Sequence, residues 1–320
     1  MPKVSVIVPC YNHAPFVAER IQSILNQTYQ DFELILMDDS STDGSISVLN
    51  QFKDTDKVAH FILNVKNSGN TFKQWNKGIR LAKGEYIWIA ESDDLAESVF
   101  LENLVLVLDE QKDTSIAYCQ SIRLDEQNNQ HGVWKFYSVN IDTSIFSASF
   151  TMKGTKFIKN FLVNENVIPN VSAVLFRKSV FLETEGASEE VKYCADWLQW
   201  LKMLSYYNVS YLSTPYNYFR FHTNSVIANT RKNNRHLYLF DVNMRWKYRF
   251  FLLKYVKNND LINLNNNMIR QNYMSYGIKM FNEGRKREGA LYFTKAAAFP
   301  FLDFKLAISH AKYILSRLIR

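Results

Sequence analysis

Residues 84–94 constrain the fold more than any other stretch of the sequence. Residues 86–89 are mostly apolar and β-favouring, and three carboxylates follow within four positions: Glu91, Asp93 and Asp94. The pattern predicts a buried strand with acids at its carboxyl end, where ligands bind in open α/β sheets. Clustered carboxylates there suit Mg²⁺ or Mn²⁺ carrying a phosphate-bearing substrate. The alternative is an acidic turn that caps the next helix, since Asp and Ser favour cap positions.

The composition is that of a folded globular protein. The 320 residues are 47% hydrophobic, enough for one large core or two domains. The excess of Lys and Arg (38) over Asp and Glu (31) favours anionic partners, such as nucleotides, lipid headgroups or nucleic acid. Three widely spaced cysteines and a strand pattern directly after Lys3, with no signal peptide, predict a cytoplasmic location. No apolar run is long enough to span a membrane, so we expect any membrane contact to be peripheral.

Strand and helix patterns alternate through the first third of the chain. Strands are predicted over residues 4–9, 32–37, 58–63 and 86–89, and helices over residues 15–26, 46–52 and 71–82. This alternation is typical of a parallel sheet covered by helices.

Polar side chains follow three of these strands, so they are expected to meet at one edge of the sheet. Neither Gly-x-Gly-x-x-Gly nor the Walker pattern occurs, which argues against a dinucleotide enzyme and a P-loop ATPase. Asp39, after the second strand, is suited to accept the imide proton of a uracil or thymine ring, a charge-assisted bond that selects the base. A helix cap is the alternative, although two adjacent acids exceed what capping requires.

Five motifs stand in order within about a hundred residues, a highly specific combination. They are Pro-Cys-Tyr-Asn (9–12), Asp-Asp-Ser-Ser-Thr-Asp-Gly-Ser (38–45), Asn-Ser-Gly (67–69), Asn-Lys-Gly-Ile (76–79) and the stretch 84–94. Together they resemble the family 2 glycosyltransferases with the GT-A fold, and the N-terminal half is similar to the bacterial spore-coat glycosyltransferase prototype. The resemblance implies an α/β fold with a Rossmann-like mixed sheet between helices.

The resemblance also implies roles for individual residues. The acid equivalent to Asp39 contacts the uracil, and Asp93, the last acid of the Asp-x-Asp motif, binds Mn²⁺ or Mg²⁺; Glu91 stands where the family has its first Asp. The expected nucleotide-binding residues are Pro9, Tyr11, Asn12, Asp38, Asp39, Asn67, Gly69, Ser92 and Arg220. The expected metal ligands are Asp93 and His222, with Glu91 and Asp94 as further candidates.

The middle third of the chain is expected to handle the acceptor. A helix is predicted over residues 101–108, strands over 116–123 and 171–177, and an irregular aromatic loop over 133–150. An aromatic helix begins near Tyr193, and its Asp196 matches the Asp of the family's Glu-Asp pair, which is the catalytic base. Ala195 replaces the Glu of that pair. Asp196 could instead complement the helix dipole.

Residues 218–225 follow a predicted loop containing Pro215 and resemble the family's Arg-x-His segment. A neutral imidazole, here that of His222, can complete a Mn²⁺ site otherwise built from carboxylate and diphosphate oxygens. Arg220 is suited to neutralise phosphate. For His222 a solvated loop histidine is the alternative.

Helical patterns continue to the end of the chain after a basic linker over residues 229–236. We therefore expect a GT-A domain over residues 1–228, with a donor half (1–100) and an acceptor half (101–228), and a helical region over 229–320. The last helix, over residues 301–320, is amphipathic and basic. It would either pack within its own domain or lie against an anionic membrane at the inner face of the cell membrane.

These patterns predict an inverting, metal-dependent glycosyltransferase. Its donor would be a nucleotide sugar, most simply UDP-linked, and its acceptor a saccharide or lipid-linked saccharide in bacterial surface glycan synthesis; no nucleic-acid partner is expected. One alternative is a degenerate nucleotide-sugar-binding module at a membrane, suggested by Glu91 and Ala195. Another is a sugar nucleotidyltransferase, disfavoured because such enzymes have a Gly-rich first loop in place of residues 9–12.

Overall fold

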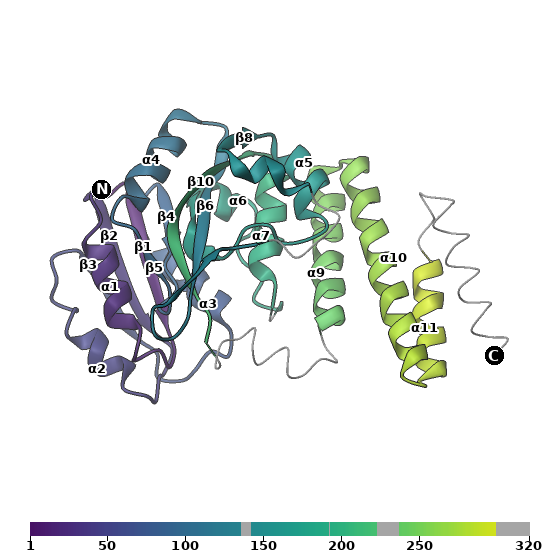
Figure 1. Ribbon diagram of the computed structural model, residues 1–320, viewed down its shortest axis with the longest axis horizontal. Coiled ribbons are helices and arrows are strands. Elements are labelled where there is room, and N and C mark those ends of the chain that lie inside the picture. Colours follow the sequence, from purple (N-terminus) through teal and green to yellow (C-terminus); the bar gives the residue numbers. More distant parts are fainter. Residues whose placement is uncertain (136–141, 192, 223–236, 299–320) are drawn as a thin grey trace. The chain divides into compact units, whose positions relative to one another are not determined.

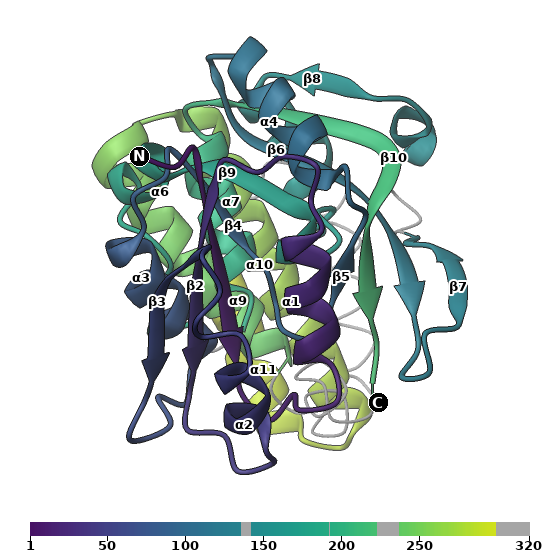
Figure 2. The ribbon, with the colours of Figure 1, turned by 90° about the vertical axis from the view of Figure 1, so that its left-hand side faces the viewer.

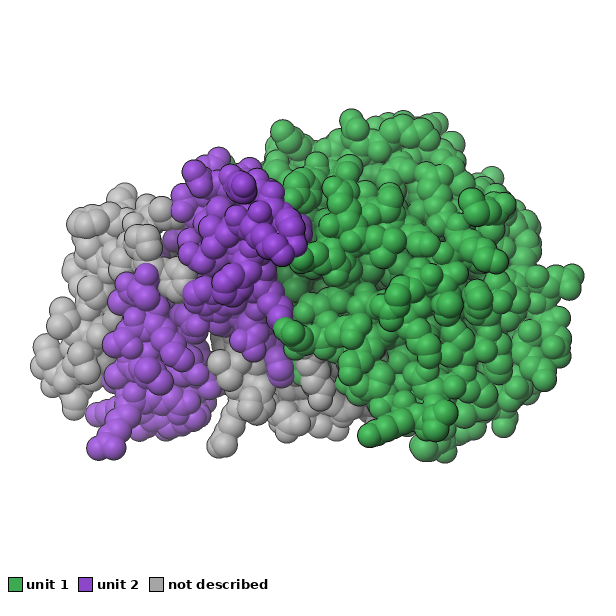
Figure 3. Space-filling model, turned by 180° about the vertical axis from the view of Figure 1, so that it is seen from behind, with its two compact units in different colours: residues 1–234 green, residues 235–320 purple. Residues whose placement is uncertain are grey.

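The chain forms two compact units in a computed structural model, residues 1–234 and residues 235–320 (Figure 3). The structure describes residues 1–135, 142–191, 193–222 and 237–298, with the backbone alone for residues 237–239. The predicted boundary after residue 228 lies in the undescribed stretch 223–236, so it stays a prediction.

A mixed sheet organises the first unit (Figure 1). Its strands are β1 (Val4–Cys10), β2 (Phe32–Asp38), β3 (Val58–Leu63), β4 (Tyr86–Ile89), β5 (Leu95–Ala96), β6 (Thr114–Leu124), β7 (Gln130–Val133), β8 (Phe150–Met152), β9 (Val174–Arg177) and β10 (Asn208–Arg220). In the described residues their order is β3-β2-β1-β4-β9-β6-β10-β5, with β7 beside β6 and β8 beside β10. The first four run parallel, and β9 lies antiparallel between β4 and β6. The predicted α/β fold with a mixed sheet is confirmed.

Helices cover both faces of this sheet (Figure 2). They are α1 (Val17–Leu25), α2 (Ser45–Asn50), α3 (Thr71–Leu81), α4 (Phe100–Glu110), α5 (Gly154–Phe157), α6 (Lys178–Glu183) and α7 (Ala195–Leu204). Alternate residues of β1 point to opposite faces, as strand geometry requires. Val6 lies in one core with Ile21 of α1 and Leu104 of α4. Ile7 faces the opposite way, toward Gly78 of α3.

The predicted strand over residues 171–177 is only partly a strand. Its first three residues form a 3₁₀ turn, η3 (Val171–Ala173), before β9 begins. The turn presents Ser172 to the end of β4: the Ser172 carbonyl accepts from Trp88 Nε1 at 2.8 Å and its Oγ accepts from the Glu91 amide at 3.1 Å. The 3₁₀ turn therefore positions the acidic strand end.

The prediction of a loop containing Pro215 is wrong. β10 passes through Pro215, and its register against β6 shifts on either side of that residue. Proline has no amide hydrogen to donate, so the ladder is interrupted there without the strand ending. The continuous strand carries Arg220 and His222 to the edge where β4 ends.

The described part of the second unit is helical, as predicted. Its described helices are α9 (Leu237–Phe251), α10 (Asn259–Asn282) and α11 (Lys286–Ala297), and a π-helical stretch (Leu252–Val256) follows α9. Gly277 lets α10 and α11 approach closely, because a Cβ there would lie 2.7 Å from the ring of Phe293. None of the described helices is both long and apolar enough to cross a membrane. The predicted helix over residues 301–320 lies outside the described residues.

Candidate metal and nucleotide site

The loops after β1 and β2 are tied together by Asn12. Its backbone is left-handed (φ 55°), its amide donates to Ser41 Oγ at 2.9 Å, and its Oδ1 accepts from the Thr42 amide at 2.8 Å. Asparagine tolerates this conformation better than most residues. The next residue, His13, is anchored by its amide, which donates to Ser45 Oγ at 3.0 Å. Asn12 thus fixes the loop that presents His13.

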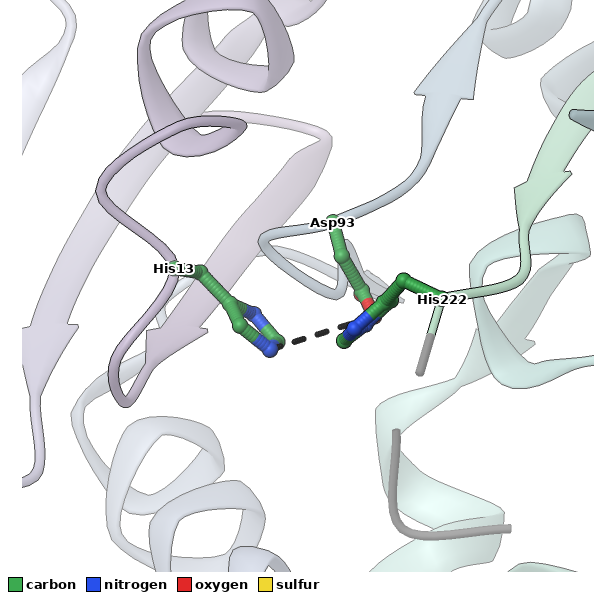
Figure 4. Close-up of side chains that lie close together, drawn as sticks. All are labelled: His13, Asp93 and His222. Carbon is green, nitrogen blue, oxygen red and sulfur yellow. Dashed lines mark hydrogen bonds and ion pairs between the residues drawn. The ribbon is translucent and has the colours of Figure 1, made fainter. Parts of the chain in front are cut away.

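Three side chains from three strand ends point toward one another: His13 after β1, Asp93 after β4 and His222 after β10 (Figure 4). His222 Nε2 lies 3.1 Å from Asp93 Oδ2, and His13 Nε2 lies 4.0 Å from the same oxygen. One potential ligand atom from each residue lies within 4.8 Å of the other two. The Asp93 and His13 side chains keep 18% and 22% exposure, so the cluster is open to a small ion.

Contact between Asp93 and His222 favours the charged form of each side chain. Burial acts to raise the pKa of Asp93, but the bond from His222 and the neighbouring His13 outweigh burial and hold it below its ordinary value. The same bond raises the pKa of His222. The cluster therefore contains an ionised carboxylate, the form that binds a metal.

The two other candidate metal ligands face different partners. Glu91 accepts from Trp75 Nε1 at 2.9 Å, and burial together with the charge of Asp93 raises its pKa to about 8. Asp94 accepts from Asn170 Nδ2 at 2.6 Å, and the same two causes raise its pKa to about 7. The three-residue cluster thus contains Asp93 and neither Glu91 nor Asp94.

The Arg220 guanidinium already donates hydrogen bonds to other groups of the protein. Its side chain is 1% exposed; Nε donates to the Asp93 carbonyl at 2.8 Å and Nη2 to Glu19 at 3.2 Å. Nη1 donates to the Asp125 carbonyl and to Asn128 Oδ1. A phosphate contact would require Arg220 to give up some of these bonds, whereas the bonds as they stand fasten the loop that carries Asp93.

Asp39 organises the loop expected to meet the base. Its carboxylate accepts from Asn64 Nδ2 at 2.7 Å, Gln74 Nε2 at 2.9 Å, and both the amide and hydroxyl of Ser68. Asn67 Nδ2 donates to the Asp39 carbonyl at 2.9 Å. A uracil imide would have to share the Asp39 carboxylate with these donors or displace one of them.

The remaining expected nucleotide residues surround the same edge. Pro9 is buried within β1, whereas Tyr11 just beyond it is 47% exposed and Gly69 is exposed in the left-handed region (φ 70°). Asp38 is buried at the end of β2, where its Oδ1 accepts from the Ser41 amide at 2.8 Å. Ser92 is 1% exposed, and its Oγ lies 2.7 Å from His13 Nδ1. Ser92 thus contacts the cluster of His13, Asp93 and His222 directly.

Asp196 lies in the first turn of α7, as predicted. Its Oδ2 accepts from Asn166 Nδ2 at 3.0 Å. Burial raises its pKa above the ordinary value, although helix amides and Asn166 act in the opposite direction. A carboxylate with raised basicity is suited to accept a proton.

His13 and Asn166 were missed by the sequence reasoning. A signal for His13 existed, because it directly follows the motif Pro-Cys-Tyr-Asn at the end of a strand whose neighbour ends in acids. Asn166 had no such signal: it lies outside any motif, 30 residues before the acid that it contacts.

Known proteins resemble this chain in sequence and in fold. The family model described as Glycosyl transferase family 2 matches residues 5–183. Glycosyltransferase GlyG of Streptococcus pneumoniae serotype 4 is 33% identical over 186 residues, 51% of this chain and 58% of that protein. Poly(ribitol-phosphate) beta-glucosyltransferase of Bacillus spizizenii is 33% identical over 173 residues, 52% of this chain and 26% of that protein.

Among solved structures, S. aureus TarS 1-349 in complex with UDP-GlcNAc has a TM-score of 0.61 at 16% identity. The likeness covers 92% of this chain and 90% of that one, and it is a likeness of fold. The matched part is less than two thirds of the length of either curated relative. Because the family model spans more than half of the sequence, the chain belongs to glycosyl transferase family 2.

Proposed function

We propose that the protein is an inverting, metal-dependent glycosyltransferase that moves a sugar from a UDP-sugar to a hydroxyl of a saccharide or lipid-linked saccharide. The observation that carries the proposal is the convergence of Asp93 and His222 at the end of β4, in a chain of this family. The name of one curated relative, poly(ribitol-phosphate) beta-glucosyltransferase, supports an acceptor in bacterial surface glycan synthesis.

The donor atoms of this site fit a divalent cation. Asp93 supplies an ionised carboxylate, which suits Mn²⁺, and His222 an imidazole nitrogen 3.1 Å from it, a ligand type common to divalent transition metals. Asp93 and His222 would hold the ion. When bound, it would supply positive charge against the departing diphosphate.

Asp196 is proposed as the general base. A sugar hydroxyl is a poor nucleophile near neutral pH, so direct displacement needs a base within hydrogen-bond reach of it. Asp196 would take the hydroxyl proton while the acceptor oxygen forms a bond to the anomeric carbon and the nucleotide leaves. Asn166 would hold the carboxylate in one orientation through its 3.0 Å bond. A single displacement of this kind inverts the anomeric carbon and needs no covalent enzyme intermediate.

The nucleotide would lie against the loops after β1 and β2. Asp39 and Ser68 would contact the base, and Asn12 would keep the two loops together. Arg220 would act through the Asp93 loop that it fastens.

Calorimetry with UDP tests the metal part of the proposal. Asp93→Ala should abolish the metal-dependent part of UDP binding and His222→Ala should weaken it. UDP affinity that is unchanged by EDTA, or by Asp93→Ala, would remove the metal from the mechanism.

Turnover of UDP-sugars tests the enzyme part. Mn²⁺-dependent release of UDP from a donor sugar is expected of an enzyme and not of a binding module. Once an acceptor is found, NMR coupling constants of the product report the anomeric configuration; a retained configuration would overturn the single displacement.

A further inference from the structure

We propose that His13 is a third protein ligand, and that His13, Asp93 and His222 bind one transition-metal ion such as Mn²⁺ or Co²⁺ before the nucleotide arrives, in preference to Mg²⁺. The use of that ion in sugar transfer rests on the proposed function. Binding of the ion to these three side chains does not, and it can be measured with metal salts alone.

The separations of the ligand atoms fit one ion. Metal–nitrogen and metal–oxygen bonds of about 2.0–2.2 Å place two ligands of one ion about 3 to 4 Å apart. His222 Nε2 lies 3.1 Å and His13 Nε2 4.0 Å from Asp93 Oδ2, with all three atoms within 4.8 Å of one another. Closing the widest separation requires a shift of roughly an ångström or less.

The imidazole of His13 is held so that Nε2 faces the cluster. Its other nitrogen, Nδ1, lies 2.7 Å from Ser92 Oγ. When Nδ1 donates its hydrogen to that oxygen, Nε2 carries the lone pair that a metal needs. The His13 amide is fixed separately by Ser45 Oγ at 3.0 Å. A histidine held at two points loses little freedom on binding an ion.

His222 is likewise confined. Its side chain is 5% exposed, and its ring centroid lies 5.4 Å from that of His13 and 5.4 Å from that of Phe16. Its Nε2 already contacts Asp93 Oδ2, so an ion would take the place of the hydrogen that bridges the two atoms. The site is therefore largely formed before a ligand arrives.

The ligand types decide which ion binds without nucleotide. Mg²⁺ prefers six oxygen ligands in near-ideal octahedral geometry and retains its waters, so it is usually held by carboxylates and substrate phosphates. An imidazole nitrogen is a softer ligand than oxygen and favours divalent transition metals over Mg²⁺, with affinity rising from Mn²⁺ to Co²⁺ and beyond. With two imidazoles and one carboxylate, the site should bind Mn²⁺ or Co²⁺ in the absence of nucleotide. Mg²⁺ would need the phosphate oxygens of the donor as further ligands.

Calorimetry on the full chain, stripped of metal and free of nucleotide, tests this selectivity. One Mn²⁺ per chain is expected, with Mg²⁺ bound at least about tenfold more weakly. His13→Gln should weaken Mn²⁺ binding by about tenfold or more, the scale known for groups that support a metal site. His60→Gln, a change of a histidine on β3, is the matched control and should leave Mn²⁺ affinity unchanged.

Electron spin-echo modulation of the Mn²⁺-loaded protein counts the coordinated imidazoles directly. Two are expected in the wild-type protein and one in His13→Gln. A single imidazole in the wild type, unchanged Mn²⁺ affinity in folded His13→Gln, no Mn²⁺ binding without nucleotide, or equal affinity for Mg²⁺ would each overturn the inference. The number of imidazoles in the wild-type protein tests the inference even if His13→Gln fails to fold. Two imidazoles without any transfer activity would overturn the proposed function alone.

Discussion

Three acids at the end of β4 differ in proton affinity because each faces different neighbours. Asp93 meets two histidines and its pKa is lowered, whereas the pKa values of Glu91 and Asp94 are raised to about 8 and about 7 by burial and by the charge of Asp93. Negative charge is therefore favoured on Asp93, beside the histidines, over its two buried neighbours. The site thus separates the acid that lies beside the histidines from two acids that accept from Trp75 and Asn170, all within four positions.

A prediction at this scale concerns Asp196→Asn. Asparagine keeps the shape of the side chain and can still accept from Asn166, but it cannot take a proton. Sugar transfer should fall by roughly 10²-fold or more, the usual scale for losing a general base, while UDP affinity stays nearly unchanged. Steady-state kinetics and calorimetry measure the two quantities. Asp260→Asn, an exposed acid in the first turn of α10, is the control. Near-normal transfer by Asp196→Asn would refute the assignment.

The pH dependence of transfer follows from the same residue. A base must be deprotonated, so kcat/KM should fall as the pH drops through the pKa of Asp196, which burial places above the ordinary Asp value. Asn166→Ala removes a bond that lowers this pKa, so the acid limb of the profile should move to higher pH. Lower activity with an acid limb at the wild-type pH would show that Asn166 has only a structural role.

At the scale of elements, the chain is packed tightly against β1 just before β4 begins. The Gly84 amide donates to Ser5 Oγ at 2.8 Å, and Ser5 Oγ donates to Glu33 Oε1 at 2.6 Å. A Cβ on Gly84 would lie 2.5 Å from the Ser5 amide nitrogen and 2.7 Å from the Val4 carbonyl carbon. Only glycine lets β4 enter the sheet beside β1 at this register.

Gly84→Ala is therefore expected to destabilise the protein. The clash is with backbone atoms, which cannot rotate away, so the free energy of unfolding should fall by about 1–3 kcal/mol. Denaturant unfolding measures this change. Lys83→Ala, at the exposed neighbouring position, keeps the backbone bond from the Lys83 amide to Glu33 and should stay within about 0.5 kcal/mol of wild type. Equal stability of Gly84→Ala would mean that β1 and β4 can move apart.

At the scale of the whole molecule, every candidate site residue belongs to the first unit, residues 1–234. A chain ending at residue 234 should fold and bind Mn²⁺ and UDP with affinities close to those of the full chain, because a compact unit has its own core and this one holds every candidate ligand. Calorimetry on both chains tests this. Loss of UDP binding with intact folding would show that the second unit contributes to the site.

The second whole-molecule prediction concerns residues 301–320, which lie outside the described residues. Their apolar and basic positions separate on a helical projection, so the full chain is expected to float with anionic vesicles at low salt and to remain unbound at high salt. A chain ending at residue 300 is the control. Equal flotation of both chains would favour packing of this segment within its own unit.

The strand and helix pattern of the first unit was determined by the sequence itself. Residues 32–37 predicted β2 correctly because that strand is buried on both faces, and the β-favouring run 58–63 predicted β3 correctly although that strand is partly exposed. The ends of β1, β2 and β4 then indicated which polar residues meet, including Asp93. The pairing of Asp93 with His222 was inferred from the family's motif, and the structure brings the two together.

Only the tertiary structure decided which neighbouring side chain each polar group faces. Glu91 and Asp93 are two positions apart, yet one contacts Trp75 and the other His222. Arg220 belongs to the Arg-x-His segment and was expected to neutralise phosphate, but it donates to the carbonyl of Asp93, 127 positions away in the chain. Such partners are set by contacts between distant segments, on which local composition carries no information. For this reason Asn166, 30 residues before Asp196, could be found only from the folded structure.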